Sequence, residues 1–300
     1  MNLHKNLKEF EDAITYAAND LNTSAAIIEK DYYVTLFLKN LVKKVPNLLF
    51  KGGTSLSKCY KLINRFSEDI DLTLDSSVQS KKTKKQLKNN IIEVCQELNF
   101  KLINEEDIKS GRNYNRYEIE YNHHFEDNGI KPYLLVETVF IVKSYPFEIK
   151  KASSMIYDFL EKNNNLETIK KYQMSPFDIK VQSLNRTLID KVFALCDYVL
   201  LNKTEGHSRH IYDLYKILEF VPLDNELKKL VLDVREDRKQ NKNCISAQND
   251  CDIKIVLKKI INEKSYYNDY KKITEKVLFD NISYETAISS IQKIINSNIF

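Results

Sequence analysis

The sequence predicts an α+β protein, with a mixed-sheet domain at residues 1–180 and a helical bundle at residues 181–300. One observation is the β-α-β-α order of the apolar patterns between residues 48 and 98. A second is a group of runs rich in Tyr, Ile, Val and Phe between residues 101 and 149. The third is almost continuous helical periodicity after residue 181. A sheet followed by helices is typical of the α+β class.

The elements of the sheet domain follow from periodicity and from turn residues. Apolar residues at helical or alternating spacing predict the helices and the first strands. Two later runs, at 114–121 and 133–142, predict antiparallel strands, because the turn signals Asp127-Asn128-Gly129 and Tyr145-Pro146 bound them. The expected elements before these runs are helices at 7–21, 24–43, 54–64 and 81–98 and strands at 48–51 and 69–74.

The helical part begins after a last short strand at 177–181. Helical spacing of apolar residues predicts helices at 184–201, 209–220 and 225–239, with further helices to Phe300. We therefore expect the domain boundary near residue 180.

Composition narrows the class of protein. The chain has 300 residues, of which 43% are hydrophobic and 29% charged, and no apolar run approaches the roughly 18 residues of a membrane span. Its polar beginning does not resemble a signal peptide, and its five scattered cysteines form no zinc motif. A soluble, cytoplasmic protein without a membrane partner is expected. The net charge of +4 permits an acidic partner such as RNA or a nucleotide but does not require one.

A Gly-Gly pair marks the first candidate site. Gly52 and Gly53 stand between the strand at 48–51 and a helix that continues with Thr54 and Ser55. Glycines let the backbone approach a ligand closely, and a helix start directs free N–H groups and hydroxyls at an anion such as phosphate. The alternative is an ordinary strand-to-helix turn, capped by Thr54 or Ser55.

An Asp-Ile-Asp strand supplies the second element of the site. Asp69 and Asp71 are two apart on a strand, so both point to one face, while Ile70, Leu72 and Leu74 point into the core. Carboxylates on a rigid strand are suited to bind hard divalent cations. The alternative is a solvated strand face, but paired carboxylates need a cation or an arginine partner. The nearby Gly-Gly turn favours a metal–phosphate site.

With these motifs the sequence resembles the AbiEii/AbiGii-type nucleotidyltransferases, toxins of bacterial toxin–antitoxin pairs within the DNA polymerase β-like superfamily. The resemblance covers about residues 25–215 and implies a nucleotidyltransferase mixed sheet with flanking helices. It rests on the stretches EKDYYV at 29–34, FKGGTSL at 50–56 and RFSEDIDL at 65–72, and on a later lysine and Asp-Leu-Tyr pair.

The resemblance extends the site to the helical part. It implies that Lys191 contacts phosphate and that Asp213 is the later active-site aspartate. Lys191 borders an apolar helix face, so its packed stem would present a focused cation, although a surface lysine is the commoner case. Lys58, two residues after the second stretch, and Arg65, the first residue of the third, are further candidate phosphate contacts. Family members often show Arg-Asp where this chain has Arg209-His210, which leaves the roles of that pair open.

A third carboxylate is usual in the superfamily, where it completes the metal site and can act as a general base. Glu137 is the best candidate, because a lone acid within an apolar strand needs a partner when it is buried. An exposed edge position would explain Glu137 equally well.

The resemblance implies a function. One or two Mg²⁺ ions would bind the NTP, whose NMP would pass to an acceptor hydroxyl, first of all the 3′ end of a tRNA, and an antitoxin would be the cognate partner. Two alternatives are a transferase that modifies a protein hydroxyl and a non-catalytic nucleotide-binding or partner-binding module. Lysine-rich helices, such as 81–85, are more typical of solvated faces than of RNA contacts.

Overall fold

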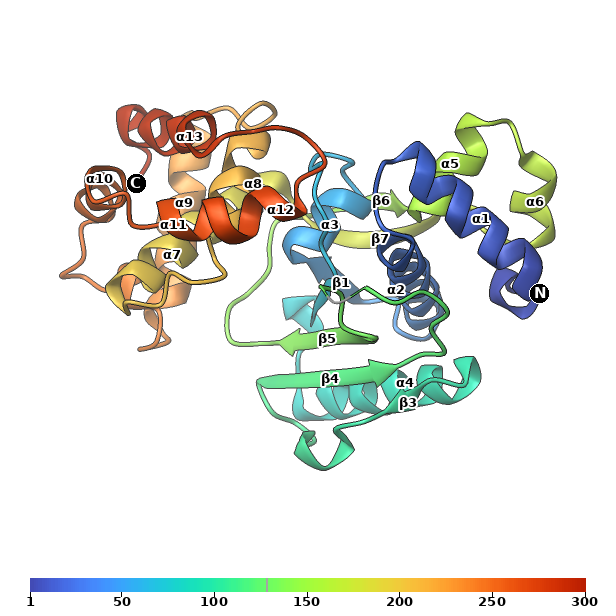
Figure 1. Cartoon of the computed structure of the whole chain (residues 1–300). Coiled ribbons are helices and arrows are strands. Elements are labelled where there is room, and N and C mark those ends of the chain that lie inside the picture. The colour runs from blue at the N-terminus through green and yellow to red at the C-terminus, as the bar shows by residue number, and fades with distance from the viewer. Residues whose placement is uncertain (128) are drawn as a thin grey trace. The chain divides into compact units, whose positions relative to one another are not determined.

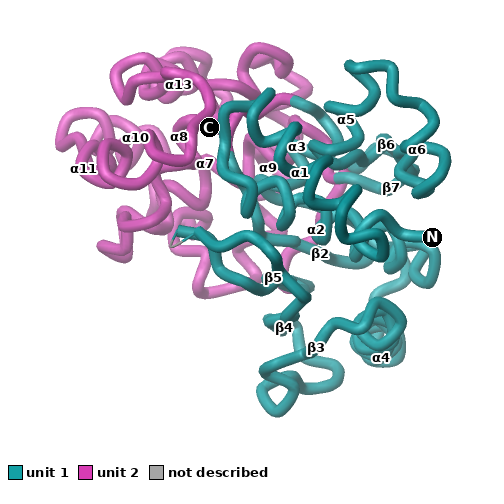
Figure 2. Tube along the Cα trace, turned by 45° about the vertical axis from the view of Figure 1, so that its right-hand side comes forward, with its two compact units in different colours: residues 1–61, 66–140, 147–181 teal, residues 62–65, 141–146, 182–300 magenta. Residues whose placement is uncertain are grey.

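The computed structural model describes residues 1–127 and 129–300, shown in Figure 1. Asn128, in the middle of a turn indicated by the sequence, lies outside the described residues. The chain divides into two compact units (Figure 2). Unit 1 contains residues 1–61, 66–140 and 147–181, and unit 2 contains residues 62–65, 141–146 and 182–300.

A mixed β-sheet is the centre of unit 1. In the described part of the chain it has seven strands in the order β3-β4-β5-β2-β1-β7-β6. β1 pairs antiparallel with β2 and parallel with β7, β2 pairs parallel with β5, and β4 pairs antiparallel with β3 and β5. The α+β prediction is confirmed. The strands are β1 (Leu48–Lys51), β2 (Asp69–Leu74), β3 (Lys101–Leu102), β4 (Tyr114–Glu120), β5 (Tyr133–Val139), β6 (Phe147–Ala152) and β7 (Phe177–Gln182).

Helices of unit 1 form where caps and apolar spacing agree. Ser80 and Thr83 form a reciprocal capping box at the start of α4, and Asn99 ends that helix in the left-handed region. The buried side of α2 packs against α4 and α5. The helices are α1 (Leu7–Asp20), α2 (Ala25–Lys44), α3 (Gly52–Lys58), α4 (Lys81–Leu98), α5 (Met155–Lys162) and α6 (Leu166–Lys171), with 3₁₀ turns at Leu3–Lys5, Ser76–Val78 and Glu105–Asp107.

The helix after the Gly-Gly pair is shorter than the sequence suggests. Apolar spacing predicts a helix at 54–64, whereas α3 begins at Gly52 and ends at Lys58. Lys61 has a φ of 54°, a left-handed conformation that a right-handed helix excludes. The chain therefore leaves α3 early and runs from there toward β2.

The core of unit 1 decides which face of β2 is open. Ile70 and Leu72 are fully buried and Leu74 nearly so, in a cluster that also contains apolar residues of α2 and α4. Side chains alternate along a strand, so Asp69 and Asp71 lie on the opposite face.

Unit 2 is helical. α7 packs against α8, α9 and α10, and α13 packs against α8 and α10. Ser183 caps α7 through the Arg186 N–H, Asp224 caps α9, and Ser283 caps α13. Among the described residues, no helix is both long and apolar enough to cross a membrane. The helices are α7 (Leu184–Leu200), α8 (Arg209–Ile217), α9 (Asn225–Lys239), α10 (Ile253–Asn262), α11 (Tyr267–Asp269), α12 (Glu275–Val277) and α13 (Tyr284–Ser297), with a 3₁₀ turn at Ile245–Ala247 and a π turn at Tyr270–Thr274.

Candidate active site

A row of four charged residues crosses the open face of the sheet. On the antiparallel side of β2, Asp71 pairs with Lys51; on its parallel side, Asp71 pairs with Glu137. Glu137 in turn pairs with Arg116 on β4. Directly paired residues project to the same side of a sheet. Lys51, Asp71, Glu137 and Arg116, called here the charge row, therefore place two carboxylates between two cations.

Glu137 is thus placed beside the Asp-x-Asp strand. Asp71 and Glu137 lie directly opposite each other on adjacent strands, which are about 4.8 Å apart. Like charges in this arrangement destabilise a sheet unless a cation lies near them. Asp69 lies one row away, paired with Leu135. Tyr114 donates a hydrogen bond to Glu137 (Oη–Oε1, 2.9 Å), and burial and this acceptor raise the pKa of Tyr114 to about 12. Three carboxylates on one face of adjacent strands are a donor set suited to a hard divalent cation.

Gly52 brings the Gly-Gly turn against Asp71. Gly52 has a φ of 77°, and a Cβ atom at this position would lie 1.9 Å from Oδ2 of Asp71. Two independent constraints therefore require glycine, the left-handed backbone and the contact with the carboxylate. The two motifs that the sequence singles out separately are one structure.

The hydroxyls after the Gly-Gly pair have partners within the protein. Thr54 and Ser55 are fully buried. Oγ1 of Thr54 is 2.9 Å from Oγ of Ser67, which ties α3 to the segment that enters β2. Ser55 donates to the Gly52 carbonyl (2.8 Å) and stabilises the turn. Lys51, the residue before α3, makes no side-chain cap hydrogen bond to the helix. The phosphate contacts expected of these residues remain predictions.

Lys58, the last residue of α3, forms a buried ion pair with Asp31 of α2. Its Nζ donates to Oδ1 of Asp31 (2.6 Å), to the Asp31 carbonyl (3.1 Å) and to Oγ1 of Thr35 (2.6 Å). These three acceptors use all three protons of the ammonium. Burial lowers the pKa of Lys58, and Asp31 opposes that shift. In this arrangement Lys58 fixes α3 to α2 and has no donor left for the phosphate expected from the sequence.

Lys30 supports the entry into β2. Its buried ammonium binds the Glu68 carboxylate and the Lys131 carbonyl (2.9 Å). Burial lowers the pKa of Lys30, whereas Glu68 and Asp69 raise it. Because Glu68 precedes Asp69 and Lys131 precedes β5, Lys30 holds the starts of both acidic strands. The stretch 29–34 therefore has a positioning role that sequence reasoning did not assign.

In unit 2, Arg65, Lys191 and Asp213 form a buried ionic cluster. Arg65 binds Asp213 through two hydrogen bonds, from Nε to Oδ1 (2.7 Å) and from Nη2 to Oδ2 (2.8 Å). Lys191 donates to Oδ2 of the same carboxylate at 2.5 Å. Burial alone would raise the pKa of Asp213, but Arg65 and Lys191 hold it well below its ordinary value. The cluster thus contains three residues that the sequence analysis gave as candidates. Its two cations and one anion leave it with a net positive charge.

His210 borders this cluster. Its Nδ1 lies 3.4 Å from Nζ of Lys191, and burial, together with Lys191, lowers the pKa of His210 well below its ordinary value. His210 is therefore neutral at pH 7, and its Nδ1 can accept a hydrogen bond from the Lys191 ammonium. Tyr198 and His207 stack beside it, with ring centroids 3.5 Å apart and an interplanar angle of 7°. The sequence left Arg209-His210 open, and the structure places His210 against Lys191.

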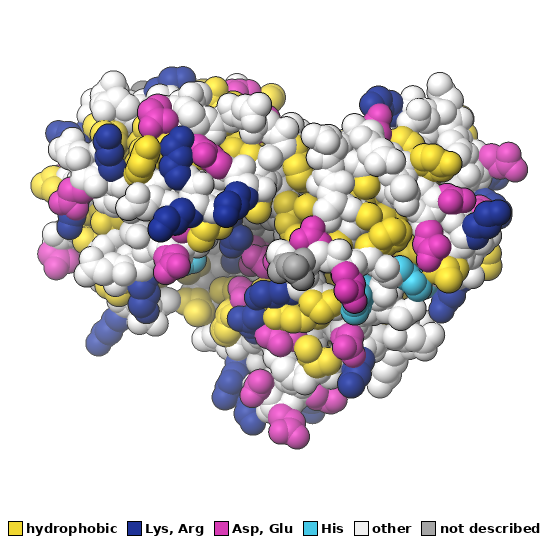
Figure 3. All heavy atoms as spheres, in the orientation of Figure 1, with side chains coloured by type: hydrophobic (Ala, Val, Ile, Leu, Met, Phe, Trp, Pro, Cys, Tyr) yellow, Lys and Arg dark blue, Asp and Glu magenta, His cyan; other side chains and the backbone are white. Residues whose placement is uncertain are grey.

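Lysines of the C-terminal helices occur beside acidic residues, as Figure 3 shows for one face. Lys271 contacts Glu275 at 2.7 Å and Lys259 contacts Glu263 at 3.9 Å, both at i, i+4 spacing. Such pairs are typical of solvated helix faces.

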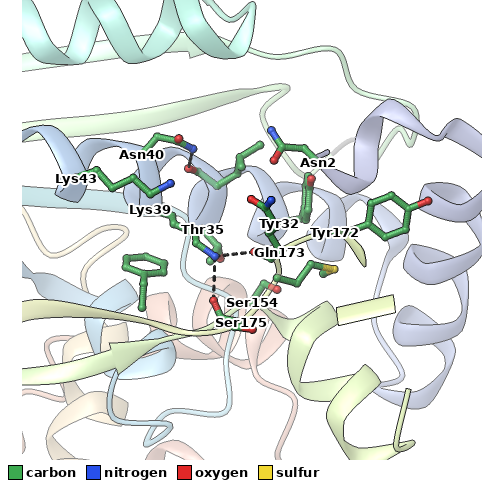
Figure 4. Close-up of a pocket in the computed structure, with 13 residues that line it drawn as sticks. Asn2, Tyr32, Thr35, Lys39, Asn40, Lys43, Ser154, Tyr172, Gln173 and Ser175 are labelled. Carbon is green, nitrogen blue, oxygen red and sulfur yellow. Dashed lines mark hydrogen bonds between the residues drawn. The ribbon is translucent and has the colours of Figure 1, made fainter. Parts of the chain in front are cut away.

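Figure 4 shows a small pocket in unit 1. None of the four charge-row residues lines it. It lies between α2 and the segment before β7, where Lys39 donates to the carbonyls of Gln173 (2.6 Å) and Ser175 (3.0 Å). Its volume is about 60 Å³. Pockets for drug-sized ligands have roughly 300–1,000 Å³, so this one is too small for a nucleoside triphosphate.

The donor set fits a metal that is shared with a substrate. Within residues 1–127 and 129–300, no three Asp, Glu, His or Cys side chains are gathered into a cage that would hold a metal by themselves. Mg²⁺ is usually bound by one or two carboxylates, water and substrate phosphates, so it does not require such a cage. The chemistry of Asp69 and Asp71 fits such a shared ion, and their role as its ligands stays a prediction.

Sequence reasoning missed three residues of the open face, Lys51, Tyr114 and Arg116. Their alternation with buried neighbours was a usable signal for Tyr114 and Arg116, because Asn115 and Tyr117 point inward. The pairing that sets them beside Glu137 arises from strands distant in sequence and left no local signal.

The mixed sheet, its Asp-x-Asp strand and the adjoining Gly-Gly turn define the class of a nucleotidyltransferase. The family model described as "Nucleotidyl transferase AbiEii toxin, Type IV TA system" matches residues 36–291. The chain therefore belongs to the AbiEii family of nucleotidyltransferase toxins of toxin–antitoxin systems, and the resemblance seen in the sequence is confirmed.

A solved structure shares the fold. The chain is similar to MenT4, a nucleotidyltransferase toxin from Mycobacterium tuberculosis H37Rv, with 15% sequence identity and a TM-score of 0.50. The similarity covers 94% of this chain and 98% of the MenT4 chain. None of the curated proteins matches the sequence significantly.

Proposed function

We propose that the open face of the sheet transfers an NMP from an NTP to an acceptor hydroxyl in a Mg²⁺-dependent reaction. The observation that carries the proposal is the placement of Asp71, which has Glu137 beside it on the next strand and the Gly52 backbone against its carboxylate. One or two Mg²⁺ ions, held by Asp69 and Asp71 with Glu137 as a third candidate ligand, would neutralise phosphate oxygens and acidify the attacking hydroxyl.

The chain's own residues position the donor. Lys51, the residue before α3, makes no side-chain cap hydrogen bond to the helix, and the glycines allow close approach, so Gly52, Gly53 and the N–H groups that follow are the proposed triphosphate contacts. Thr54 and Ser55 support this turn through their internal hydrogen bonds. Lys58 is proposed to act on the donor indirectly, since its ammonium holds α3 in place.

The transfer itself is a single displacement. The acceptor oxygen forms a bond to the α-phosphorus, and the bond from that phosphorus to the bridging oxygen of the β-phosphate breaks, so that pyrophosphate leaves with its electron pair. Glu137 is the proposed base for the proton of the acceptor hydroxyl. Its hydrogen bond from Tyr114 orients the carboxylate and leaves its other oxygen for that proton.

The cluster in unit 2 is proposed to serve phosphate binding as well. Lys191 is the proposed phosphate contact and Arg65 a second one, while Asp213 orients both. The net positive charge of these three buried groups supports attraction of an anion. This part of the proposal rests on residues of unit 2 alone.

Membership of the AbiEii family supports a proposal for the acceptor and the partners. The 3′ end of a tRNA is the proposed acceptor, growth inhibition in the cytoplasm the proposed outcome, and a cognate antitoxin the proposed partner. A protein hydroxyl as acceptor is the competing outcome in the test below.

The test supplies each α-labelled NTP with Mg²⁺ and either total RNA or lysate protein to the full chain. Asp69→Asn, Asp71→Asn and Glu137→Gln should lose label transfer by about 100-fold or more, as expected when a group that stabilises developing charge is removed. Asp178→Asn, an exposed carboxylate on β7, is the matched control and should keep the wild-type rate. Transfer that persists in the Asp69 and Asp71 variants would refute the proposal, and label on polypeptide would replace RNA as the acceptor.

A further inference from the structure

The strand order places different functional groups on the two sides of β2. Gly52 and the donor turn lie on the β1 side of β2, whereas Glu137 on β5 and then β4 lie on its other side. In a displacement at phosphorus, the attacking and leaving oxygens are roughly in line on opposite sides of the phosphoryl group. If the pyrophosphate leaves toward the Gly52 side, the acceptor oxygen has to approach from the β4 side.

Two exposed side chains of β4 flank that approach. Tyr114 is 44% exposed, although its hydroxyl is bound to Glu137. Arg116 pairs directly with Glu137, and its side chain is 39% exposed. One end of its guanidinium contacts Glu118 (Nη2–Oε1, 3.1 Å), while Nε is enclosed without a hydrogen-bond partner in the part of the chain that is described. An aromatic ring and a partly exposed guanidinium thus lie next to the proposed base.

We infer that Tyr114 and Arg116 form the acceptor subsite and that its ligand is the last nucleotide of a single-stranded polynucleotide with a free 3′-hydroxyl. This inference rests on the proposed function and deepens it. A 3′-terminal nucleotide carries a base, a hydroxyl and a phosphodiester within one residue. The base stacks on the ring of Tyr114, the guanidinium of Arg116 binds the phosphodiester, and Glu137 faces the hydroxyl.

The charge row favours a polynucleotide over a protein acceptor. Asp71 and Glu137 repel an incoming phosphodiester, so an acceptor that carries one needs a cation beyond the carboxylates. Arg116 occupies that position at the β4 end of the row. A serine, threonine or tyrosine side chain brings no phosphate, so it would offer this guanidinium only a neutral hydroxyl or ring contact and no charge-assisted hydrogen bond.

The test measures binding in the absence of NTP, so it does not depend on turnover. Fluorescence anisotropy with a labelled single-stranded RNA octamer ending in a 3′-hydroxyl gives Kd and its salt dependence for the full chain. Arg116→Gln should weaken binding about tenfold, as for loss of one charge-assisted hydrogen bond. It should also reduce the salt slope by about 0.7, the value for one phosphate contact on a single strand.

Two variants of Tyr114 separate the ring from the hydroxyl. Tyr114→Leu should weaken RNA binding about tenfold through lost stacking, whereas Tyr114→Phe keeps the ring and should bind like wild type. Lys151→Gln, which removes an exposed lysine of the opposite edge strand β6, is the control and should leave Kd unchanged. All variants should bind NTP like the wild type, which shows that the sheet is intact.

Wild-type Kd and salt slope in both Arg116→Gln and Tyr114→Leu would overturn the inference. So would RNA binding too weak to detect in the wild type while a protein acceptor receives the label. Failure of the proposed function would give a different result, because Asp71→Asn would then transfer label as fast as the wild type. The RNA affinities of the Tyr114 and Arg116 variants are measured without turnover, so they test the inference in either case.

Discussion

Replacement of Gly52 by alanine probes the contact between the Gly-Gly turn and the acidic strand. The new Cβ would lie 1.9 Å from Oδ2 of Asp71, where real Cβ contacts are essentially never shorter than 3.0 Å. The carboxylate therefore has to move by about 1 Å, a displacement that costs about 100-fold in rate when it affects a catalytic group. The left-handed φ of 77° adds about 1–2 kcal/mol to the cost of folding an alanine there.

Gly111→Ala is the matched control for Gly52→Ala. Gly111 also belongs to unit 1 and has a φ of 75°, but apart from its chain neighbours no atom of the described residues lies within 4 Å of its added Cβ. Gly111→Ala should lose about 1–2 kcal/mol of unfolding free energy in urea denaturation, and Gly52→Ala at least as much because of the added contact with Asp71. Initial rates of label transfer at saturating NTP should fall about 100-fold in Gly52→Ala alone. Equal rates in the two variants would refute the reasoning that Gly52 is fixed by Asp71.

Two further predictions concern the buried ion pairs. Lys58→Met should cost about 3–5 kcal/mol of unfolding free energy, because it leaves the Asp31 carboxylate buried without its cation; Lys61→Met, from an exposed pair, should cost about 0–1 kcal/mol, and similar losses in urea denaturation would contradict this contrast. The pKa of Asp213 is lowered by folding, so its stabilisation is complete above its unfolded pKa of about 3.9 and is lost as pH falls toward the folded value. The difference in unfolding free energy between wild type and Asp213→Asn should thus be constant from about pH 7 to 5 and shrink below about pH 4; a difference that grows on acidification would contradict it.

Local patterns predicted the elements that carry the acidic strand. The alternation of acidic and apolar residues from Asp69 to Leu72 predicted both the strand and the face of each side chain. Only one assignment of the two faces places the apolar residues in the core. The sequence also predicted α4, where the structure confirms the helix and adds a capping box. Strands and helices of this kind depend on residues close together in the sequence, so local patterns can predict them.

Long-range pairing lay beyond the sequence. β1 and β2 are antiparallel although a helix connects them, because α3 ends at Lys58 and the chain turns back. The pairing of Asp71 with Glu137 and the bonds between Arg65 and Asp213 join residues far apart in the chain, and no local period encodes them. The burial of Lys58 depends on α2 in the same way.

The proposal that Asp69 and Asp71 form a divalent-metal site can be tested by equilibrium Mn²⁺ binding. Electron paramagnetic resonance of free Mn²⁺, with a non-hydrolysable NTP analogue present, gives the number of ions bound per chain. We expect one or two ions in the wild type and in Asp178→Asn, and at least about tenfold weaker binding in Asp69→Asn and Asp71→Asn. Equal Mn²⁺ affinity in all four proteins would contradict the claim.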